Sequence, residues 1–264
     1  MKRSAFRLSR EASKIALFKT INVHTDTTLK REHGVFYSNL EVFRKSLPDQ
    51  GTKGYGRWAW KPFIIAEQLM KMPEGDLLLY IDAGCHFNWN STSTDRFQKY
   101  CEEAFKFGYL AMQLYPNEGG TGDLFEYNYN SIDNQESIYS SVESWESCQI
   151  QATLVFLVNN KVNRSFVNEW LTLATENNFW RLDERNIRAT HESFKEYRWD
   201  QSIFSLLSKK YKLNVILDET WWGEGWQTYG RSYPIWAMRH RSGAKPFGGK
   251  YEGLLDKFLT RMNL

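Results

Sequence analysis

Several features that mark other protein classes are scarce in this chain of 264 residues. Its three cysteines, Cys85, Cys101 and Cys148, are odd in number and fit no zinc-ligand spacing, so we expect free buried thiols rather than disulfides or metal ligands. No apolar run approaches the roughly 18 residues of a membrane helix, and residues 1–10 lack the apolar stretch of a secretory signal. We therefore expect a cytoplasmic protein without a transmembrane segment.

The chain also lacks a strong excess of either charge and any internal boundary. Its 34 basic and 31 acidic residues leave a formal net charge of +3, which gives no indication of a nucleic-acid partner. No repeat, low-complexity tract or Pro/Gly-rich linker divides it, so a single domain over residues 1–264 is expected. With 42% hydrophobic and 16% aromatic residues, the chain has enough apolar surface to fold.

Hydrophobic periodicity predicts helices and strands in alternation. Leu77–Ile81 is a continuous apolar run, typical of a strand buried on both faces of a largely parallel sheet. The pattern predicts an α/β fold with a mostly parallel central sheet flanked by helices, in which ligands collect at the carboxyl ends of the strands. Helices are expected over 7–18, 62–72, 94–105, 165–175, 201–211 and 253–261, and strands over 20–25, 77–81, 109–114, 152–158, 214–217 and 235–238.

Asp82 directly follows the apolar run at 77–81. A carboxylate held by a rigid strand at the edge of a sheet is placed to meet a metal ion or a phosphate-bearing ligand. The alternative is an ordinary turn, in which Asp82 bonds the N–H groups of Gly84 and Cys85. For an isolated Asp the turn is the better interpretation, so Asp82 needs support from elsewhere in the chain.

Residues 231–250 contain five Lys or Arg and no Asp or Glu. Such a block is often a solvated basic face. Here glycines, Gly243 among them, are interleaved with Lys245 and its neighbours, and glycine lets backbone N–H groups approach an anion while lysine neutralises it. The segment therefore favours a diphosphate. His240 is either a ligand of a divalent cation or a buried, hydrogen-bonded histidine.

Asp200 and Gln201 stand at the predicted start of the helix over 201–211. Asp200 is a natural N-cap for this helix, which needs no catalytic role. The same pair could instead hold a sugar hydroxyl or accept its proton. The sequence leaves the two interpretations open.

The segment 54–62, GYGRWAWKP, combines aromatic and basic side chains. Trp58 and Trp60 could stack on a base or a sugar ring, with Arg57 and Lys61 reaching a phosphate. Alternatively, the aromatic rings pack the entry to a helix. Both interpretations remain open for the two tryptophans.

Taken together, GYGRWAWKP, LLLYIDAGC, QIQATLVFLV and WDQSIFSLL resemble glycosyltransferases of the GT-A fold, and more narrowly a group of small bacterial and viral polysaccharide glycosyltransferases. HRSGAKP is similar to the His-x-x-Gly-x-x-Lys-Pro motif of glycogenin-like transferases, but one residue shorter. The resemblance implies transfer of a sugar from a nucleotide-diphosphate donor to a glycan acceptor, in polysaccharide or glycoconjugate synthesis. The expected partners are then a nucleotide-sugar donor and a glycan acceptor, and no nucleic-acid partner is expected.

The resemblance also implies a metal and diphosphate site. Asp82 and His240 would bind a divalent metal ion, Mn²⁺ or Mg²⁺, while Gly243 and Lys245 would embrace the diphosphate. Position 84 is Gly where Asp-x-Asp enzymes have their second carboxylate, so we expect weak metal dependence. The resemblance also implies that the family's first strand is absent from this chain, because residues 4–25 look like the family's first helix and second strand.

The remaining site residues follow from the same resemblance. Arg57 and Lys61 would lie near the donor together with Asp82, and Asp200 and Gln201 would face the transferred sugar as the catalytic pair. Two other functions compete with sugar transfer. A non-catalytic glycan-binding module of the same fold would explain Gly84 and the wealth of tryptophan, whereas a nucleotidyltransferase would usually show a Gly-rich loop early in the chain.

Overall fold

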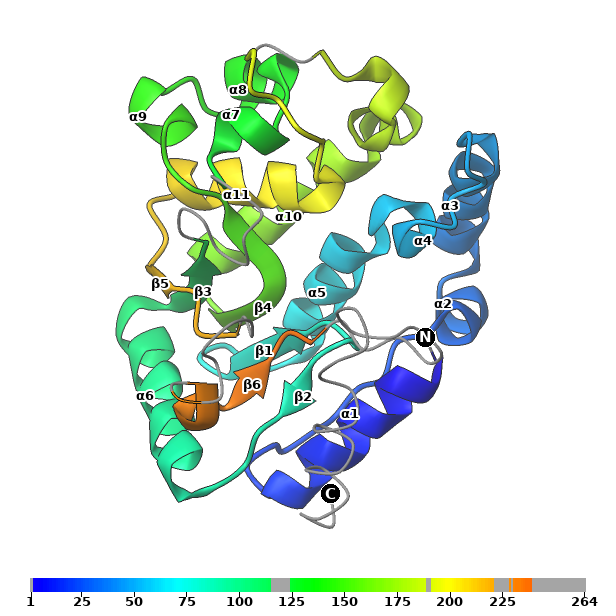
Figure 1. Cartoon of the computed structure of the whole chain (residues 1–264). Helices are drawn as coiled ribbons and strands as arrows, with labels where there is room; N and C mark the ends of the chain where they lie inside the picture. Colours follow the sequence, from blue (N-terminus) through cyan, green and yellow to red (C-terminus); the bar gives the residue numbers. More distant parts are fainter. Residues whose placement is uncertain (1, 115–123, 189–190, 221–227, 229, 239–264) are drawn as a thin grey trace. The chain divides into compact units, whose positions relative to one another are not determined.

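The structure is a computed structural model that describes residues 2–114, 124–188, 191–220, 228 and 230–238 (Figure 1). The chain divides into two compact units, and each is described by itself. Unit 1 comprises Met1–Leu29, Ile81–Gln98 and Glu219–Leu264, and unit 2 comprises Lys30–Tyr80 and Lys99–Asp218. The single GT-A-like domain over residues 1–264 stays a prediction. The helix expected over 253–261 lies outside the described residues.

A four-stranded sheet organises unit 2. Its order is β1-β4-β3-β5, formed by Leu77–Ile81, Ile150–Val158, Tyr109–Gln113 and Val215–Leu217. Strand β3 runs antiparallel to β4 and parallel to β5. The sheet is therefore mixed, and the expectation of a mostly parallel sheet is corrected. A continuous apolar run reports burial on both faces of a strand and carries no information on the direction of its neighbours.

Burial differs between the two strands with the longest apolar runs. Strand β4 is buried along most of its length, as its sequence predicts. In β1 only Tyr80 is buried and the other residues are half-buried, so the expected burial on both faces is wrong for this strand. The reason is position, since β1 stands at the end of the strand order while β4 has a neighbour on each side.

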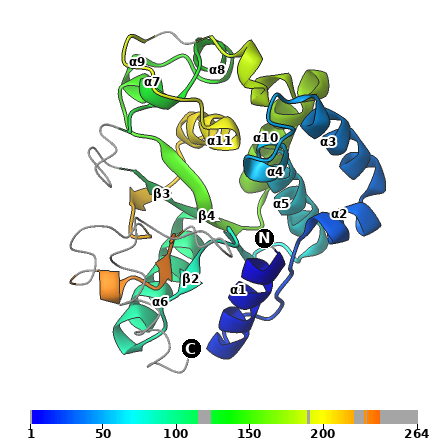
Figure 2. The ribbon, with the colours of Figure 1, turned by 45° about the vertical axis from the view of Figure 1, so that its right-hand side comes forward.

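The longer helices of unit 2 pack with this sheet and with one another. Helix α11 contacts β4, and α10 contacts both α11 and α5. Figures 1 and 2 show the short helices α7, α8 and α9 grouped beside α11. The helices lying wholly in unit 2 are α3 (Gly34–Ser46), α4 (Gly54–Arg57), α5 (Trp60–Lys71), α7 (Glu126–Tyr129), α8 (Ile132–Ile138), α9 (Val142–Trp145), α10 (Lys161–Phe179) and α11 (Trp199–Lys210), with 3-10 turns η2 (Trp180–Leu182) and η3 (Glu184–Asn186).

Unit 1 is built around helix α1 (Lys2–Ile15) and a two-stranded antiparallel sheet of β2 (His86–Phe87) and β6 (Ile235–Trp236). Helix α1 buries Leu8, Ala12 and Ile15, whose spacing places them on one face of the helix. It contacts β2. The 3-10 turn η4 (Gly230–Ser232) also belongs to this unit, while α2 (Asp26–Glu32) and α6 (Ser91–Phe107) contribute residues to both units.

Most predicted elements form within a few residues of their expected bounds. The strand expected over 20–25 is an exception, because these residues adopt no regular structure and Ile21 is exposed. Its β-branched residues favour an extended chain, but a strand needs a neighbour for its hydrogen bonds. The three cysteines are free, as predicted, with Cys101 half-buried. Among the helices that the structure describes, none has the length and apolar content to cross a bilayer.

Candidate functional site

The segment GYGRWAWKP folds into an unusual left-handed turn that leads into α5. Five consecutive residues have positive φ: Gly54 at 70°, Tyr55 at 40°, Gly56 at 67°, Arg57 at 56° and Trp58 at 58°. Left-handed backbone costs free energy for every residue with a Cβ atom, so such a run persists only where surrounding contacts hold it. Trp58 N–H donates to Gly54 O at 3.0 Å across the turn.

The two glycines of this turn are required by packing as well as by conformation. A Cβ atom on Gly54 would lie 2.3 Å from the Trp58 ring, and one on Gly56 would lie 2.7 Å from Leu40 Cδ1. Any larger residue would push the turn away from α3, which carries Leu40. The Gly-x-Gly pattern is thus explained by the local backbone.

Arg57 anchors the turn through two carboxylates. Its Nη1 and Nη2 donate to Asp49 Oδ2 and Oδ1 at 3.0 and 2.9 Å, and its Nε donates to Glu184 Oε2 at 3.0 Å. The bonds from Arg57 hold the pKa of Asp49 well below its usual range. Burial raises the pKa of Glu184, but the hydrogen bonds it accepts, from Arg57 first and from Trp199, together with the charge of Arg57, outweigh burial and lower that pKa. Trp199 completes the cluster, with its Nε1 donating to Glu184 Oε2 at 3.2 Å. The charge of Arg57 is therefore balanced inside unit 2.

Lys61 lies in the first turn of α5, and its ammonium group contacts residues from several segments that are far apart in the sequence. The side chain is 3% exposed. Its Nζ lies 2.8 Å from Asp200 Oδ2, donates to Ala152 O at 3.0 Å and stands 5.6 Å from the centre of the Tyr80 ring. A buried ammonium is tolerated only with such partners, because removing a charge from water costs several kcal/mol.

The carbonyl that Lys61 binds belongs to an irregular part of β4. The pairing of β4 with β3 shifts from Val155 opposite Ala111 to Gln151 opposite Met112, so Ala152–Leu154 have no partner residues in β3. Such bulges free backbone groups and re-aim side chains, and they are frequent beside active sites. Lys61 satisfies one of the freed carbonyl oxygens.

Asp200 stands in the first turn of α11 and is not its N-cap, which was one of the two interpretations left open by the sequence. The N-cap is Arg198, with no side-chain cap, and Asp200 is buried at 3% exposure against Lys61. The residue before it, Trp199, has a φ of 44°, a strained value for a tryptophan. Asp200 is therefore aimed at Lys61 by a strained entry to the helix.

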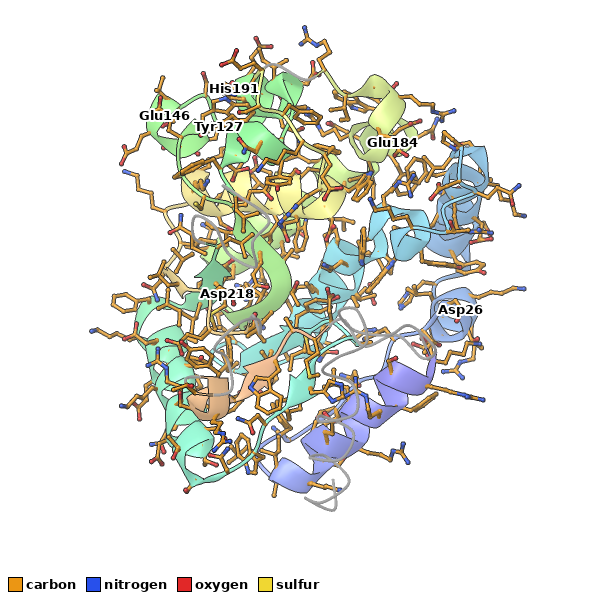
Figure 3. All side chains as sticks on the ribbon, in the orientation of Figure 1. Asp26, Tyr127, Glu146, Glu184, His191 and Asp218 are labelled. Atoms are coloured by element: carbon orange, nitrogen blue, oxygen red, sulfur yellow. The ribbon has the colours of Figure 1, made fainter. Side chains whose placement is uncertain are left out.

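Gln201 follows Asp200 and is half-buried. Its Nε2 donates to Gln149 Oε1 at 2.9 Å, one of two buried glutamines that precede or begin β4. The second is Gln151, whose Nε2 donates to Asp218 Oδ1 at 2.7 Å. Figure 3 shows Asp218 beside the sheet and Glu184 away from it, near the chain that follows α10. Gln149 and Gln151 were not identified as site residues from the sequence. Their Gln-x-Gln spacing at the start of an otherwise apolar run could have indicated them.

Asp82, the proposed metal ligand, directly follows β1 as predicted, and its backbone carbonyl accepts a hydrogen bond from Cys85 N–H at 3.0 Å. Within the described ranges, no three His, Cys, Asp or Glu side chains gather as a metal site requires. Position 84 offers no carboxylate, and His240 lies outside the described residues together with Gly243 and Lys245. The described residues by themselves do not make a complete metal site.

Of the residues singled out from sequence, Lys61 and Asp200 are brought into direct contact, and Gln201 lies next to Asp200 in α11. Arg57 holds its own carboxylates, Asp49 and Glu184. Chemically, the centre is a buried carboxylate balanced by an ammonium, flanked by amides that can donate or accept hydrogen bonds. Such groups suit a ligand rich in hydroxyls.

No protein-family model matches the chain. No curated protein matches it either. Among solved structures, the chain is similar to mouse xyloside xylosyltransferase 1 in its apo form, at 11% identity and a TM-score of 0.42, with 87% of this chain and 80% of that chain covered. A likeness at this level establishes neither a fold family nor an activity for this protein.

Proposed function

We propose that the chain transfers a sugar from a nucleotide-sugar donor to a glycan acceptor, in the synthesis of a polysaccharide or glycoconjugate. The contacts of Lys61 carry the proposal. Its ammonium meets Asp200 of WDQSIFSLL, Ala152 of QIQATLVFLV and Tyr80 of LLLYIDAGC, while Lys61 itself belongs to GYGRWAWKP. Four segments that resemble glycosyltransferase motifs thus share one buried group, as a common site requires.

Asp200 has the central role in this proposal. An ammonium at 2.8 Å stabilises the charged carboxylate, which suits it to hold a substrate hydroxyl more than to remove its proton. Gln201, one residue further along α11, faces the transferred sugar in this proposal. The strained backbone at Trp199 fixes the direction of both side chains, in keeping with the strain often found at functional sites.

On the donor side, the proposal modifies two roles. Arg57 and Lys61 are both ion-paired with carboxylates, so we assign them to holding the turn at 54–58 and Asp200, rather than to direct contact with a phosphate. The diphosphate would then be bound by Gly243 and Lys245. A metal ion held by Asp82 and His240 would neutralise the charge of the leaving diphosphate.

The test is release of nucleotide from a panel of UDP- and GDP-sugars with Mn²⁺, in the presence and absence of glycan acceptors. We expect turnover of at least one donor, lost in Asp200→Asn and retained in Lys210→Met, which alters an exposed ion pair on the same helix. If no donor is turned over or bound, sugar transfer is contradicted. Glycan binding without any UDP or GDP affinity would instead support the glycan-binding module.

A further inference from the structure

Glu126, in the short helix α7, is a fully buried carboxylate with no place in the site described above. Its Oε1 lies 2.7 Å from Lys209 Nζ and also accepts from the Ser205 hydroxyl. Its Oε2 accepts from Asn130 Nδ2 at 2.9 Å and from Gln149 Nε2 at 3.1 Å. With one ammonium and three neutral donors around it, this group acts only as an acceptor.

The partners of Glu126 form a stripe along α11. Ser205 and Lys209 are four residues apart, and Gln201 lies four residues before Ser205, so all three share one face of the helix. Gln149 closes the ring, because it donates to Glu126 and accepts from Gln201 at 2.9 Å. A continuous path of hydrogen bonds therefore joins the buried carboxylate to the residue beside Asp200.

This path has a fixed direction. A glutamine amide has a donor end and an acceptor end, whereas a carboxylate only accepts. Gln149 must turn its NH₂ group toward Glu126, which leaves its carbonyl oxygen for Gln201. Gln201 must donate its own NH₂ group to that oxygen, so the carbonyl oxygen of Gln201 points away from Gln149. Within the described residues, that oxygen accepts no hydrogen bond.

We propose that Glu126, acting through Gln149, sets the orientation of the Gln201 amide so that its carbonyl oxygen is the atom offered to the substrate. Glu126 and Gln149 are then positioning residues. Gln201 presents a carbonyl oxygen that accepts a hydrogen bond from a sugar hydroxyl. The role at the substrate rests on the proposed function. The orientation itself rests only on the contacts of unit 2.

A single-atom change reverses the path. In Glu126→Gln, the new amide keeps its oxygen toward Lys209 and Ser205 and so places an NH₂ group where Oε2 stood. The new NH₂ group would then face the NH₂ groups of both Asn130 and Gln149, and Gln149 relieves its own clash by flipping. Gln201 must flip in turn and expose its NH₂ group. Moving the carboxylate one step along the path, in Glu126→Gln/Gln149→Glu, restores an acceptor toward Gln201 and hence the original orientation.

The first measurement is the exchange of the Gln201 side-chain NH₂ with water, followed by NMR on the full chain with nitrogen-15 in its glutamine side chains. The Gln201 signal is assigned by its loss in Gln201→Glu. We expect exchange about tenfold faster in Glu126→Gln, because the NH₂ group loses its buried acceptor. The double variant should return to within about twofold of the wild type.

Two further variants keep the test decisive. Glu169→Gln makes the same change at a half-exposed ion pair with Lys210, the neighbour of Lys209, and should leave the exchange rate unchanged. Gln149→Met leaves Glu126 with Lys209, Ser205 and Asn130, and should still release the Gln201 NH₂ group, so it replaces Glu126→Gln if that variant does not fold. A slow, unchanged Gln201 signal in the folded variants would overturn the proposal.

The second measurement is steady-state turnover of whichever donor the wild type accepts. A flipped amide should lower kcat about tenfold or more in Glu126→Gln and leave the donor KM within about twofold, and the double variant should recover most of kcat. Loss of kcat without recovery in the double variant would contradict positioning and indicate a structural role. If the wild type turns over no donor, sugar transfer fails while the exchange measurement still decides the orientation.

Discussion

Helix α11 carries a buried lysine–carboxylate pair at each end, and the surroundings of the two pairs differ. At its start, Asp200 pairs with Lys61 of α5, and at its end Lys209 pairs with Glu126 of α7. Both arrangements suit the helix dipole, with the carboxylate near the N-terminus and the ammonium near the C-terminus. Burial and pairing alone therefore do not tell a functional pair from a structural one.

The neighbours of each pair make the distinction. Lys61 touches β4 at its bulge and the Tyr80 ring of β1, segments that carry the resemblance to glycosyltransferases. Glu126 instead accepts hydrogen bonds from uncharged donors such as Asn130 and Ser205, and neither residue is proposed to contact the substrate. In our proposal, the first pair holds a group for a ligand, whereas the second orients other side chains.

The largest effect is expected from breaking the first pair. Lys61→Met leaves Asp200 buried without its ammonium, which should lower the free energy of unfolding by about 3–5 kcal/mol. The measurement is urea denaturation of the full chain. Replacing both partners, in Lys61→Met/Asp200→Leu, should recover most of that loss, because two apolar side chains carry no unpaired charge. A cost below about 1 kcal/mol in the single variant would contradict a tight buried pair.

The next effect separates catalysis from stability at the same end. Asp200→Asn keeps the shape of the side chain but removes its charge, and we expect kcat for the donor to fall about 100-fold, because the substrate hydroxyl is no longer held in position. The donor KM should change little, because the diphosphate is assigned to other residues. Lys210→Met, at the opposite end of α11 and outside the site, is the control. Equal losses in kcat for the two variants would break the distinction between the ends.

A third charged cluster pairs the buried Arg57 with two half-exposed carboxylates, Asp49 and Glu184, and its contribution to stability depends on pH. Arg57 lowers the pKa of Asp49 and, against the effect of burial, that of Glu184. Folded-state pKa values below the unfolded ones of about 4 give stability that is present above that pH and is lost as the pH falls. The urea midpoint should therefore drop between pH 6 and pH 3, and drop less in Arg57→Met. Equal slopes in both proteins would refute the contribution of this cluster.

The sequence predicted most individual elements but not their pairing. Apolar runs located β1, β3 and β4, because burial and strand length are local properties of the sequence. They did not reveal that β4 runs antiparallel to β3 or that β1 ends the strand order. Both features depend on long-range connections.

The site shows the same limit. Asp200 and Lys61 were singled out separately, and nothing near either residue indicated that they would pair. The i, i+4 spacing of Gln201, Ser205 and Lys209 was readable as a polar stripe on a helix. Its partner Glu126 could not be identified without the fold, because it is far away in the chain.

The smallest expected effect tests whether burial determines how much a carboxylate–lysine pair on α11 contributes to the free energy of unfolding. Glu169 is half-buried, pairs with the exposed Lys210 and accepts a hydrogen bond from the Tyr211 hydroxyl at 2.7 Å. Glu169→Gln should change the free energy of unfolding by less than about 1 kcal/mol. The identical change at Glu126, beside the neighbouring Lys209, should cost about 1–3 kcal/mol, because a buried acceptor becomes a donor facing other donors. Urea denaturation of the two variants under one condition measures the difference. If both cost the same, burial of Glu126 does not make its hydrogen bonds stronger than those at the surface, and the orientation of Gln149 has no energetic basis.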